Sequence, residues 1–301
     1  MHRPVDTRSP AAVAAECKRL FLEIFPQGDP HIADEAFAWA IACFHGEFRS
    51  YQAVDLRYHD FEHTLQGTLC MVRLLHGRHK AHATPELTER LFQLGLLAIL
   101  LHDSGYLKTA DDREGTGAKY TLTHVGRSAD FAALLLKDKS FQPDEIRAIQ
   151  NMIRCTGVDA RPEDIPFRND LERIVGLALA TADLLGQMAA PDYVDKLPAL
   201  YEEFAEAVRF TNDHKAAIAS FTSARNLIER TPAFWENVVR KKLEDQLRGL
   251  YRFLNDPYPD GPNGYVERIE ANASLIVRTK ASLQESSPRP SSLAQRARLL
   301  N

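Results

Sequence analysis

A histidine and an aspartate stand side by side at the end of the most apolar stretch of the chain. His102 and Asp103 follow residues 91–101, which are almost all apolar and are therefore expected to be buried. A buried imidazole beside a buried carboxylate is costly unless a partner compensates, and a metal ion is the commonest partner with catalytic consequences. The alternative is a helix-end histidine that hydrogen-bonds a backbone carbonyl, with the aspartate in solvent.

Two further side chains complete a possible ligand set. His63 lies four residues after His59, so on a helix both would project from one face, about one turn apart. Asp183 stands in the segment 176–186, which is apolar on every face, where a carboxylate needs a cation or several hydrogen-bond donors. Donors from a neighbouring helix end are the alternative to a cation. Two nitrogen and two oxygen ligands suit Zn, Mn or Fe and leave room for water. The predicted ligands are His63, His102, Asp103 and Asp183.

The order of these residues resembles the HD-domain superfamily of metal-dependent phosphohydrolases. Tyr58-His59-x-x-x-His63 and Ala182-Asp183-Leu184 are similar to motifs of the class I cyclic-nucleotide phosphodiesterases. The motifs run from about residue 58 to 185, and the helical context extends the similarity from about 30 to 280. The resemblance implies an all-α chain, folded as a single multi-helix HD/PDEase-like bundle around a buried metal site.

The same resemblance implies a role for each motif residue. His63, His102, Asp103 and Asp183 would hold the first of two divalent metal ions (Zn, Mg, Mn or Fe), and Asp103 would bridge to the second. Two ions that share a carboxylate activate a bridging water to hydroxide near neutral pH and neutralise phosphate charge. His59 would be the general acid that protonates the departing oxygen.

Three residues are candidates for contact with the substrate. His124, at the start of a predicted helix, would bind the second metal ion or a phosphate oxygen, and an exposed helix-cap histidine is the alternative. Tyr58 opens the histidine motif and is expected to line the substrate site. Gln246 is a loose counterpart of the glutamine that clamps the nucleotide in the phosphodiesterases.

The sequence departs from the phosphodiesterase pattern at three places. The histidine that closely follows the His-Asp pair in that family corresponds here to Tyr106, and Gly186 stands where an asparagine often touches the base. The aromatic residue expected soon after Gln246 is out of register, with Tyr251 and Phe253 nearest. The predicted metal ligands therefore match the family better than the nucleotide pocket does.

These residues together predict a metal-dependent phosphohydrolase. The expected substrate is a small molecule, a (cyclic) nucleotide-type phosphodiester. The alternatives are a phosphomonoesterase acting on nucleotides or other small phosphates, a di-iron HD oxygenase and a non-catalytic binding module. An intact ligand set argues against the last of these, because a scaffold has no need of a buried His/Asp cluster.

The elements that must position these side chains are helices. From Pro10 onward apolar residues recur at intervals of three and four, without an alternating strand pattern of useful length. The expected helices lie at about 11–24, 29–48, 58–75, 86–101, 121–136, 143–154, 171–188, 192–210, 214–230 and 233–254, with a last one ending near 283. The polar insert 108–119 is either a lid over the site or an ordinary solvated loop.

Composition and charge define the broad class of the protein. Its 301 residues are 45% hydrophobic and carry a net charge of −4, with dispersed basic residues, so we expect neither a nucleic-acid nor a membrane partner. Four separated cysteines in apolar settings and the lack of a signal-like segment favour a cytoplasmic protein, and a homodimer is left open. Residues 1–28 are expected to form a lead-in with one helix, 29–284 the catalytic domain and 285–301 a disordered tail.

Overall fold

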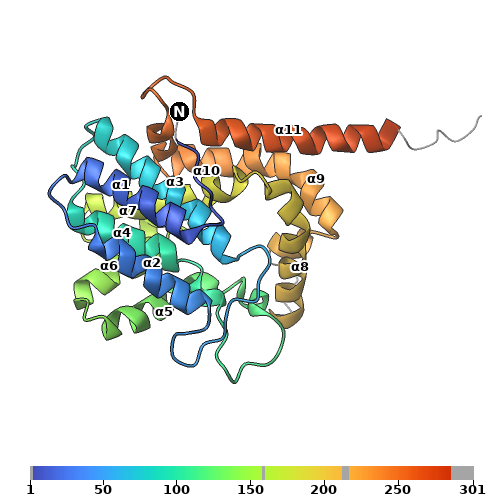
Figure 1. Ribbon diagram of the computed structural model, residues 1–301. Helices are drawn as coiled ribbons and strands as arrows, with labels where there is room; N and C mark the ends of the chain where they lie inside the picture. The colour runs from blue at the N-terminus through green and yellow to red at the C-terminus, as the bar shows by residue number, and fades with distance from the viewer. Residues whose placement is uncertain (1–2, 158–159, 212–216, 286–301) are drawn as a thin grey trace, which may run out of the picture.

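Helices joined by turns make up the computed structural model, which describes residues 3–157, 160–211 and 217–285 (Figure 1). The expected all-α class is confirmed, because the β-type pairing within these ranges is limited to the isolated bridges Tyr51–Thr109 and Asn255–Asn263. Apart from its first residue, the expected disordered tail lies outside the described residues.

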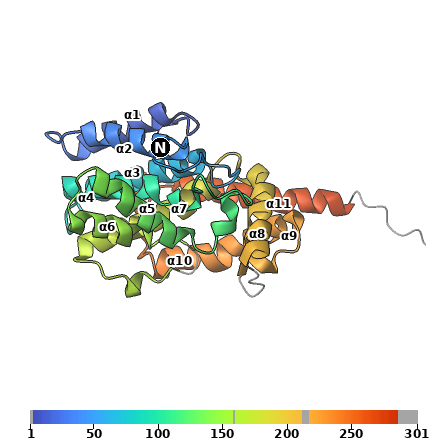
Figure 2. The same cartoon turned by 90° about the horizontal axis from the view of Figure 1, so that it is seen from below.

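The α-helices follow one another in the order α1 Pro10–Ile24, α2 His31–Phe44, α3 Phe61–Lys80, α4 Glu89–Leu101, α5 His124–Asp138, α6 Pro143–Ile153, α7 Asp170–Met188, α8 Tyr193–Thr211, α9 Ala224–Phe234, α10 Arg240–Asp245 and α11 Gly264–Glu285. Shorter helical turns are η1 Ser104–Tyr106, η2 Gly117–Tyr120, η3 Pro162–Asp164, η4 Ala217–Ser220, the π-helix η5 Trp235–Val239, and η6 Leu250–Leu254. Figure 2 shows α1 and α2 on one side of the bundle, α10 on the opposite side, and α8 and α9 at one end.

The core is built around α3, α4 and α7. Residues 63–75 of α3 and 92–101 of α4 are buried without interruption, and α3 makes its most extensive contact with α7. The first helix shares this core, since the rings of Phe21 and Phe92 lie 5.3 Å apart. All four cysteines are buried and free, as expected. The site residues therefore stand on helices that are packed on nearly every side.

A glycine sets the distance between α3 and α7. A Cβ added at Gly186 would lie 2.7 Å from the carbonyl oxygen of Gln66 and 2.8 Å from the amide nitrogen of Gly67. These backbone atoms cannot move aside as a flexible side chain can. The crossing lies three residues from Asp183 and three from His63, so it determines how closely these two side chains approach.

Replacing Gly186 by alanine is expected to destabilise the protein, because the added methyl group overpacks the α3–α7 crossing. We expect a loss of about 1–3 kcal/mol in the free energy of unfolding, measured by urea denaturation. Gly126 in α5 is the matched control, because a Cβ there would meet nothing within 4 Å. Alanine at 126 should be neutral or stabilising by up to about 1 kcal/mol. Equal stability of the two variants would refute the proposed close crossing.

Several helix boundaries differ from the expectation: α2 ends at Phe44, before the expected residue 48, and the helix expected over 214–230 is replaced by η4 and by α9, which begins at Ala224. α4 begins at Glu89, where the side chain of Thr88 accepts a hydrogen bond from the third residue of the helix, and not near residue 86 as expected. The single helix expected over 233–254 is divided into η5, α10 and η6. Arg248 and Gly249, between the last two, have positive φ angles of 53° and 64°. A right-handed helix cannot continue through that conformation.

The polar insert 108–119 is anchored to its surroundings. Glu206 of α8 accepts hydrogen bonds from the backbone amide and the hydroxyl of Thr116, and Lys108 pairs with Asp55 at 2.8 Å. The insert therefore packs against α8. Along the described residues, no single helix is both long and apolar enough to cross a membrane; α7 and α8, which meet at 110°, have the required length and composition only as a bent pair.

Candidate metal centre

His63 lies in the first turn of α3. The carboxylate of Asp60, the N-cap residue, accepts a hydrogen bond from the backbone amide of His63 at 2.9 Å. This cap begins the helix at Phe61, so the expectation of a helix from Tyr58 is wrong, and His59 and His63 do not share one helix. Another element must therefore position His59.

The His102-Asp103 pair ends α4. The Nδ1–H of His102 donates to the carbonyl oxygen of Ile99 at 2.7 Å, which leaves Nε2 as the nitrogen available to a ligand. The alternative to a metal ligand, a helix-end histidine bonded to a backbone carbonyl with the aspartate in solvent, is therefore correct for the hydrogen bond of His102. It is wrong for Asp103, which is only 3% exposed and points into the protein.

Asp183 faces the pair from the middle of α7. Gln187, one turn further on, donates from Nε2 to Oδ1 of Asp183 at 3.2 Å, and its Oε1 accepts a hydrogen bond from the hydroxyl of Tyr58 at 2.8 Å. Gln187 was not predicted as a site residue, although its spacing of four from Asp183 places both on one face of the helix. This amide holds the carboxylate in a fixed orientation.

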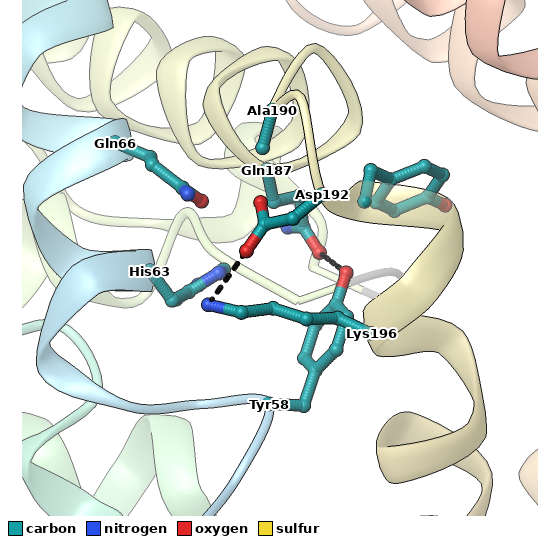
Figure 3. Close-up of a pocket in the computed structure, with 8 residues that line it drawn as sticks. Tyr58, His63, Gln66, Gln187, Ala190, Asp192 and Lys196 are labelled. Atoms are coloured by element: carbon teal, nitrogen blue, oxygen red, sulfur yellow. Dashed lines mark hydrogen bonds and ion pairs between the residues drawn. The ribbon is translucent and has the colours of Figure 1, made fainter. Parts of the chain in front are cut away.

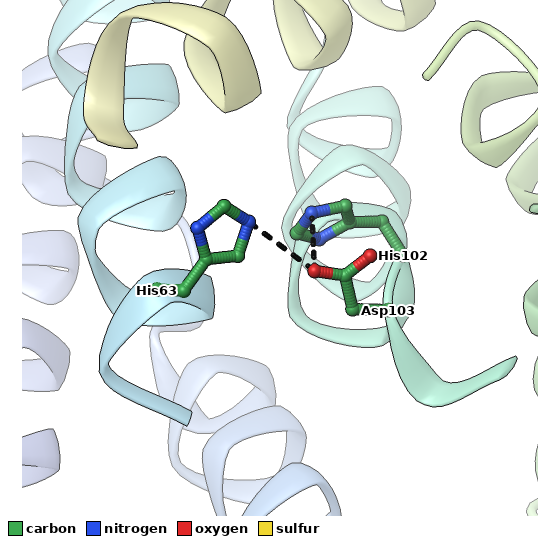
Figure 4. A group of neighbouring side chains, drawn as sticks. All are labelled: His63, His102 and Asp103. Atoms are coloured by element: carbon green, nitrogen blue, oxygen red, sulfur yellow. Dashed lines mark ion pairs between the residues drawn. The ribbon is translucent and has the colours of Figure 1, made fainter. Parts of the chain in front are cut away.

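Four donor atoms converge where α3, the end of α4 and α7 meet, and Figure 4 shows three of the residues that supply them, His63, His102 and Asp103. Nε2 of His63 lies 3.2 Å from Oδ2 of Asp103 and 3.3 Å from Oδ1 of Asp183. Nε2 of His102 lies 3.3 and 3.4 Å from the same two oxygens. His63, His102 and Asp103 form a group that could hold a metal ion. We call these three residues and Asp183 the His/Asp cluster.

The spacing within the His/Asp cluster suits ligands around an ion better than hydrogen-bonded ion pairs. Charge-assisted N–H···O bonds are about 2.7–2.9 Å long. A tetrahedral metal with ligands at about 2.0–2.1 Å has neighbouring ligand atoms roughly 3.3–3.4 Å apart. Nε2 of His102 and Oδ2 of Asp103 are moreover buried without a hydrogen-bond partner among the described residues. The donor set therefore fits a divalent cation.

The electrostatics of the His/Asp cluster are those of strongly coupled charges. Burial disfavours the charged imidazole of His63, but Asp103 and Asp183 outweigh burial and raise its pKa to about 10. Burial also opposes charge on His102, yet the same carboxylates raise its pKa. Burial raises the pKa values of both aspartates, but the two histidines lower them by more, so both pKa values are below their ordinary value. Positive charge thus stabilises both carboxylates in their ionised form.

His124 lies beside the second oxygen of Asp103. It is the first residue of α5, and its Nδ1–H donates to the carbonyl oxygen of Thr121 at 2.7 Å. Its Nε2 lies 3.7 Å from Oδ1 of Asp103. The side chain is only 16% exposed, so it is not the solvent-facing cap residue of the alternative interpretation. The structure brings His124 to the His/Asp cluster.

His59 is positioned by a glutamate that the sequence did not single out. Nδ1 of His59 lies 2.6 Å from Oε2 of Glu203 in α8. The other oxygen of Glu203 accepts hydrogen bonds from the backbone amides of Tyr58 at 2.7 Å and Arg57 at 3.1 Å. Glu203 lies on the buried face of α8, four residues before the buried Ala207. In the sequence, the signal for a role of Glu203 is an acidic residue on the face of the helix that is otherwise buried.

A small cavity lies next to His63, and Figure 3 shows the side chains that line it. Its volume is about 10 Å³, room for one water molecule. Lys196 crosses the cavity and pairs with Asp60 and Glu62 at 3.2 Å each and with Asp192 at 3.4 Å. Tyr58 is 3% exposed and forms one wall. Its hydroxyl has an internal partner, and the expected contact between Tyr58 and substrate stays a prediction.

The structure does not bring Gln246 to the His/Asp cluster. Its side chain is exposed at the C-terminal end of α10. Two residues later, Arg248 pairs at 2.9 Å with Asp170, the first residue of α7, about 20 Å along that helix from Asp183. Recognition of a base by Gln246 stays a prediction without support from a described contact.

Comparison with known proteins places the chain in a family. No curated protein matches the sequence. The sequence profile of the Npun_R2479-like family matches residues 33–255, which is most of the chain and includes the whole His/Asp cluster with His59, His124 and Glu203. The chain belongs to the Npun_R2479-like family.

Proposed function

We propose that the protein is a metal-dependent phosphohydrolase whose expected substrate is a small phosphodiester of the nucleotide type. The observation that carries the proposal is the convergence of four donor atoms, from three separate helical segments, at spacings of 3.2–3.4 Å. Their order along the chain resembles that of the HD-domain phosphohydrolases. The neighbouring His59 and His124 support hydrolysis over mere metal storage, because storage requires neither of them.

The cluster would hold the first divalent ion, and Oδ1 of Asp103 with His124 would offer ligands to a second. Such ions activate water and neutralise the charge of a phosphate. The task of the remaining residues is proton transfer and orientation. With Nδ1 of His59 bound to Glu203, Nε2 is the nitrogen from which His59 gives a proton to the leaving oxygen. Burial raises and the neighbouring His59 lowers the pKa of Glu203, with a net decrease, so this carboxylate stays ionised beside Nδ1 of His59.

The test is turnover by purified protein reconstituted with Mn²⁺, Mg²⁺ or Zn²⁺. The panel contains cyclic nucleotides, a generic phosphodiester and nucleoside monophosphates. We expect cleavage of the diesters. Cleavage of monoesters alone would replace the proposal by a phosphomonoesterase. Absence of turnover with every metal, despite bound ions, would overturn hydrolysis and leave oxidation or binding, which iron content and oxygen consumption would distinguish.

Replacing Glu203 by glutamine should lower turnover about ten- to a hundredfold without changing metal content. This is the usual cost when a residue that hydrogen-bonds and orients a functional side chain is replaced. The amide keeps the size of the side chain but removes the negative charge that faces Nδ1 of His59. The control is Glu202→Gln, because the exposed Glu202 forms only a surface pair with Arg57 at 3.4 Å. Equal turnover of the two variants would exclude Glu203 from positioning His59.

A further inference from the structure

We propose that Tyr106 is a positioning residue that supports the imidazole rings of both His59 and His124. This inference rests on the proposed function, in which these two histidines act on the substrate side of the metal centre. Tyr106 lies three residues after Asp103, in the short helix η1. Tyr106 is 2% exposed and its ring lies against both imidazoles, so it acts through these neighbours.

The three rings form one aromatic group. The ring of Tyr106 stacks on His59 with centroids 4.7 Å apart and an interplanar angle of 24°, and on His124 with centroids 4.5 Å apart and an angle of 13°. The two imidazole centroids lie 6.4 Å from each other. Each histidine therefore contacts Tyr106 more closely than it contacts the other histidine. Tyr106 is the common surface against which both imidazoles lie.

The backbone around Tyr106 is fastened to α5, the helix that carries His124. Arg127 donates from Nε to the carbonyl oxygen of Gly105 at 2.7 Å and from Nη2 to that of Leu107 at 3.0 Å. The amide of Gly105 donates to the hydroxyl oxygen of Ser128 at 2.8 Å. These bonds hold the residues on both sides of Tyr106, so its ring has little freedom relative to His124.

A glycine makes this close approach possible. A Cβ at Gly105 would lie 2.1 Å from the carbonyl oxygen of His124 and 2.6 Å from the amide nitrogen of Ser128. Any side chain at 105 would push η1 away from α5. The stacking of Tyr106 on His124 therefore depends on direct contact between the backbones of η1 and α5, which a glycine at position 105 permits.

The stack completes the restraint of each imidazole. His59 is bound at Nδ1 by Glu203, and His124 is bound at Nδ1 by the carbonyl oxygen of Thr121. One hydrogen bond to a ring nitrogen leaves the ring free to tilt about that bond. Contact with the face of Tyr106 removes this freedom and fixes the direction of Nε2 in both rings. Misplacement of a catalytic group by about 1 Å can cost roughly a hundredfold in rate.

The ring of Tyr106, and not its hydroxyl, performs this role. The hydroxyl oxygen is buried without a hydrogen-bond partner at normal geometry among the described residues. Its removal therefore costs no hydrogen bond of normal geometry and at most a distorted contact with Thr121. This separates Tyr106→Phe, which keeps the aromatic surface, from Tyr106→Leu, which fills part of the same space without a flat face.

The experiment compares Tyr106→Phe and Tyr106→Leu with the metal-loaded wild type. We expect Phe to retain turnover within about threefold, and Leu to lower kcat about ten- to a hundredfold with unchanged KM and metal content. Loss of turnover in both variants would assign the function to the hydroxyl and overturn the proposal. Full turnover in Leu would overturn it equally.

A readout without turnover separates this inference from the proposed function. In ¹⁵N-histidine NMR spectra we expect sharp, exchange-protected Nδ1–H signals from His59 and His124 in the wild type and Phe variant, and broadened ones in the Leu variant. Identical spectra would overturn the proposal even if no ester were hydrolysed. If the Leu variant does not fold, Arg127→Met, which removes the two bonds that hold Gly105 and Leu107, replaces it and should broaden the same signals. Unchanged signals in Arg127→Met would then be the contradicting result.

Discussion

Replacement of Asp103 by alanine is expected to abolish both metal retention and turnover. Asp103 is the only member of the cluster with one carboxylate oxygen toward His63 and His102, at 3.2 and 3.3 Å, and the other toward His124, at 3.7 Å. Loss of Asp103 would remove one ligand from the first ion. It would also remove the ligand that the first ion would share with the proposed second ion. Metal content by mass spectrometry and ester turnover are measured on the same sample.

Two further variants make the Asp103 experiment specific. Asp103→Asn keeps the shape of the side chain and should also lose most of its metal, because a neutral amide is a poorer ligand. Asp130→Ala, at an exposed position of α5, should retain the metal and turnover of the wild type. If Asp103→Ala kept full metal content and activity, the assignment of the site would be wrong.

Replacement of His59 by alanine is expected to separate metal binding from catalysis. His59 bonds Glu203 at 2.6 Å and belongs to none of the close contacts within the His/Asp cluster, so metal content should be unchanged. Turnover should fall about 10²- to 10⁴-fold, the usual contribution of a general acid. The loss should be smallest for substrates with a good leaving group, such as nitrophenyl esters, which need little protonation.

An exposed histidine provides the comparison for His59. His79, near the C-terminal end of α3, is solvent-exposed, and its replacement by alanine should leave turnover and metal content unchanged. Full activity of His59→Ala would exclude it as the general acid. Loss of metal in His59→Ala would instead show that His59 contributes to the metal centre itself.

The fold and the residues of the His/Asp cluster were predictable because they rest on local contrasts in the sequence. A period of three to four apolar residues predicts helices wherever it occurs. His102, Asp103 and Asp183 each interrupt or end an apolar segment, and a polar group in such a place needs a partner. The small residues around Asp183, Gly186 among them, indicate close approach of a neighbouring helix, and the structure uses Gly186 to bring α3 and α7 together.

The residues that orient the site were not predictable because their partners are distant in sequence. Glu203 bonds a histidine 144 positions earlier, and Gln187 bonds Tyr58 across 129 positions. No local pattern marks such pairs. Helix starts were misjudged for a related reason. A histidine spacing of four suggested a helix containing His59, but the cap formed by Asp60 begins α3 only after it.

The most direct test of the central claim is a crystal structure of the protein grown with Mn²⁺ or Zn²⁺, with anomalous data at the absorption edge of the metal. We predict an anomalous peak roughly 2.0–2.3 Å from Nε2 of His63 and His102 and from one oxygen each of Asp103 and Asp183. An ion bound only elsewhere, or a cluster contracted to hydrogen bonds of about 2.7–2.9 Å without an ion, would contradict the account.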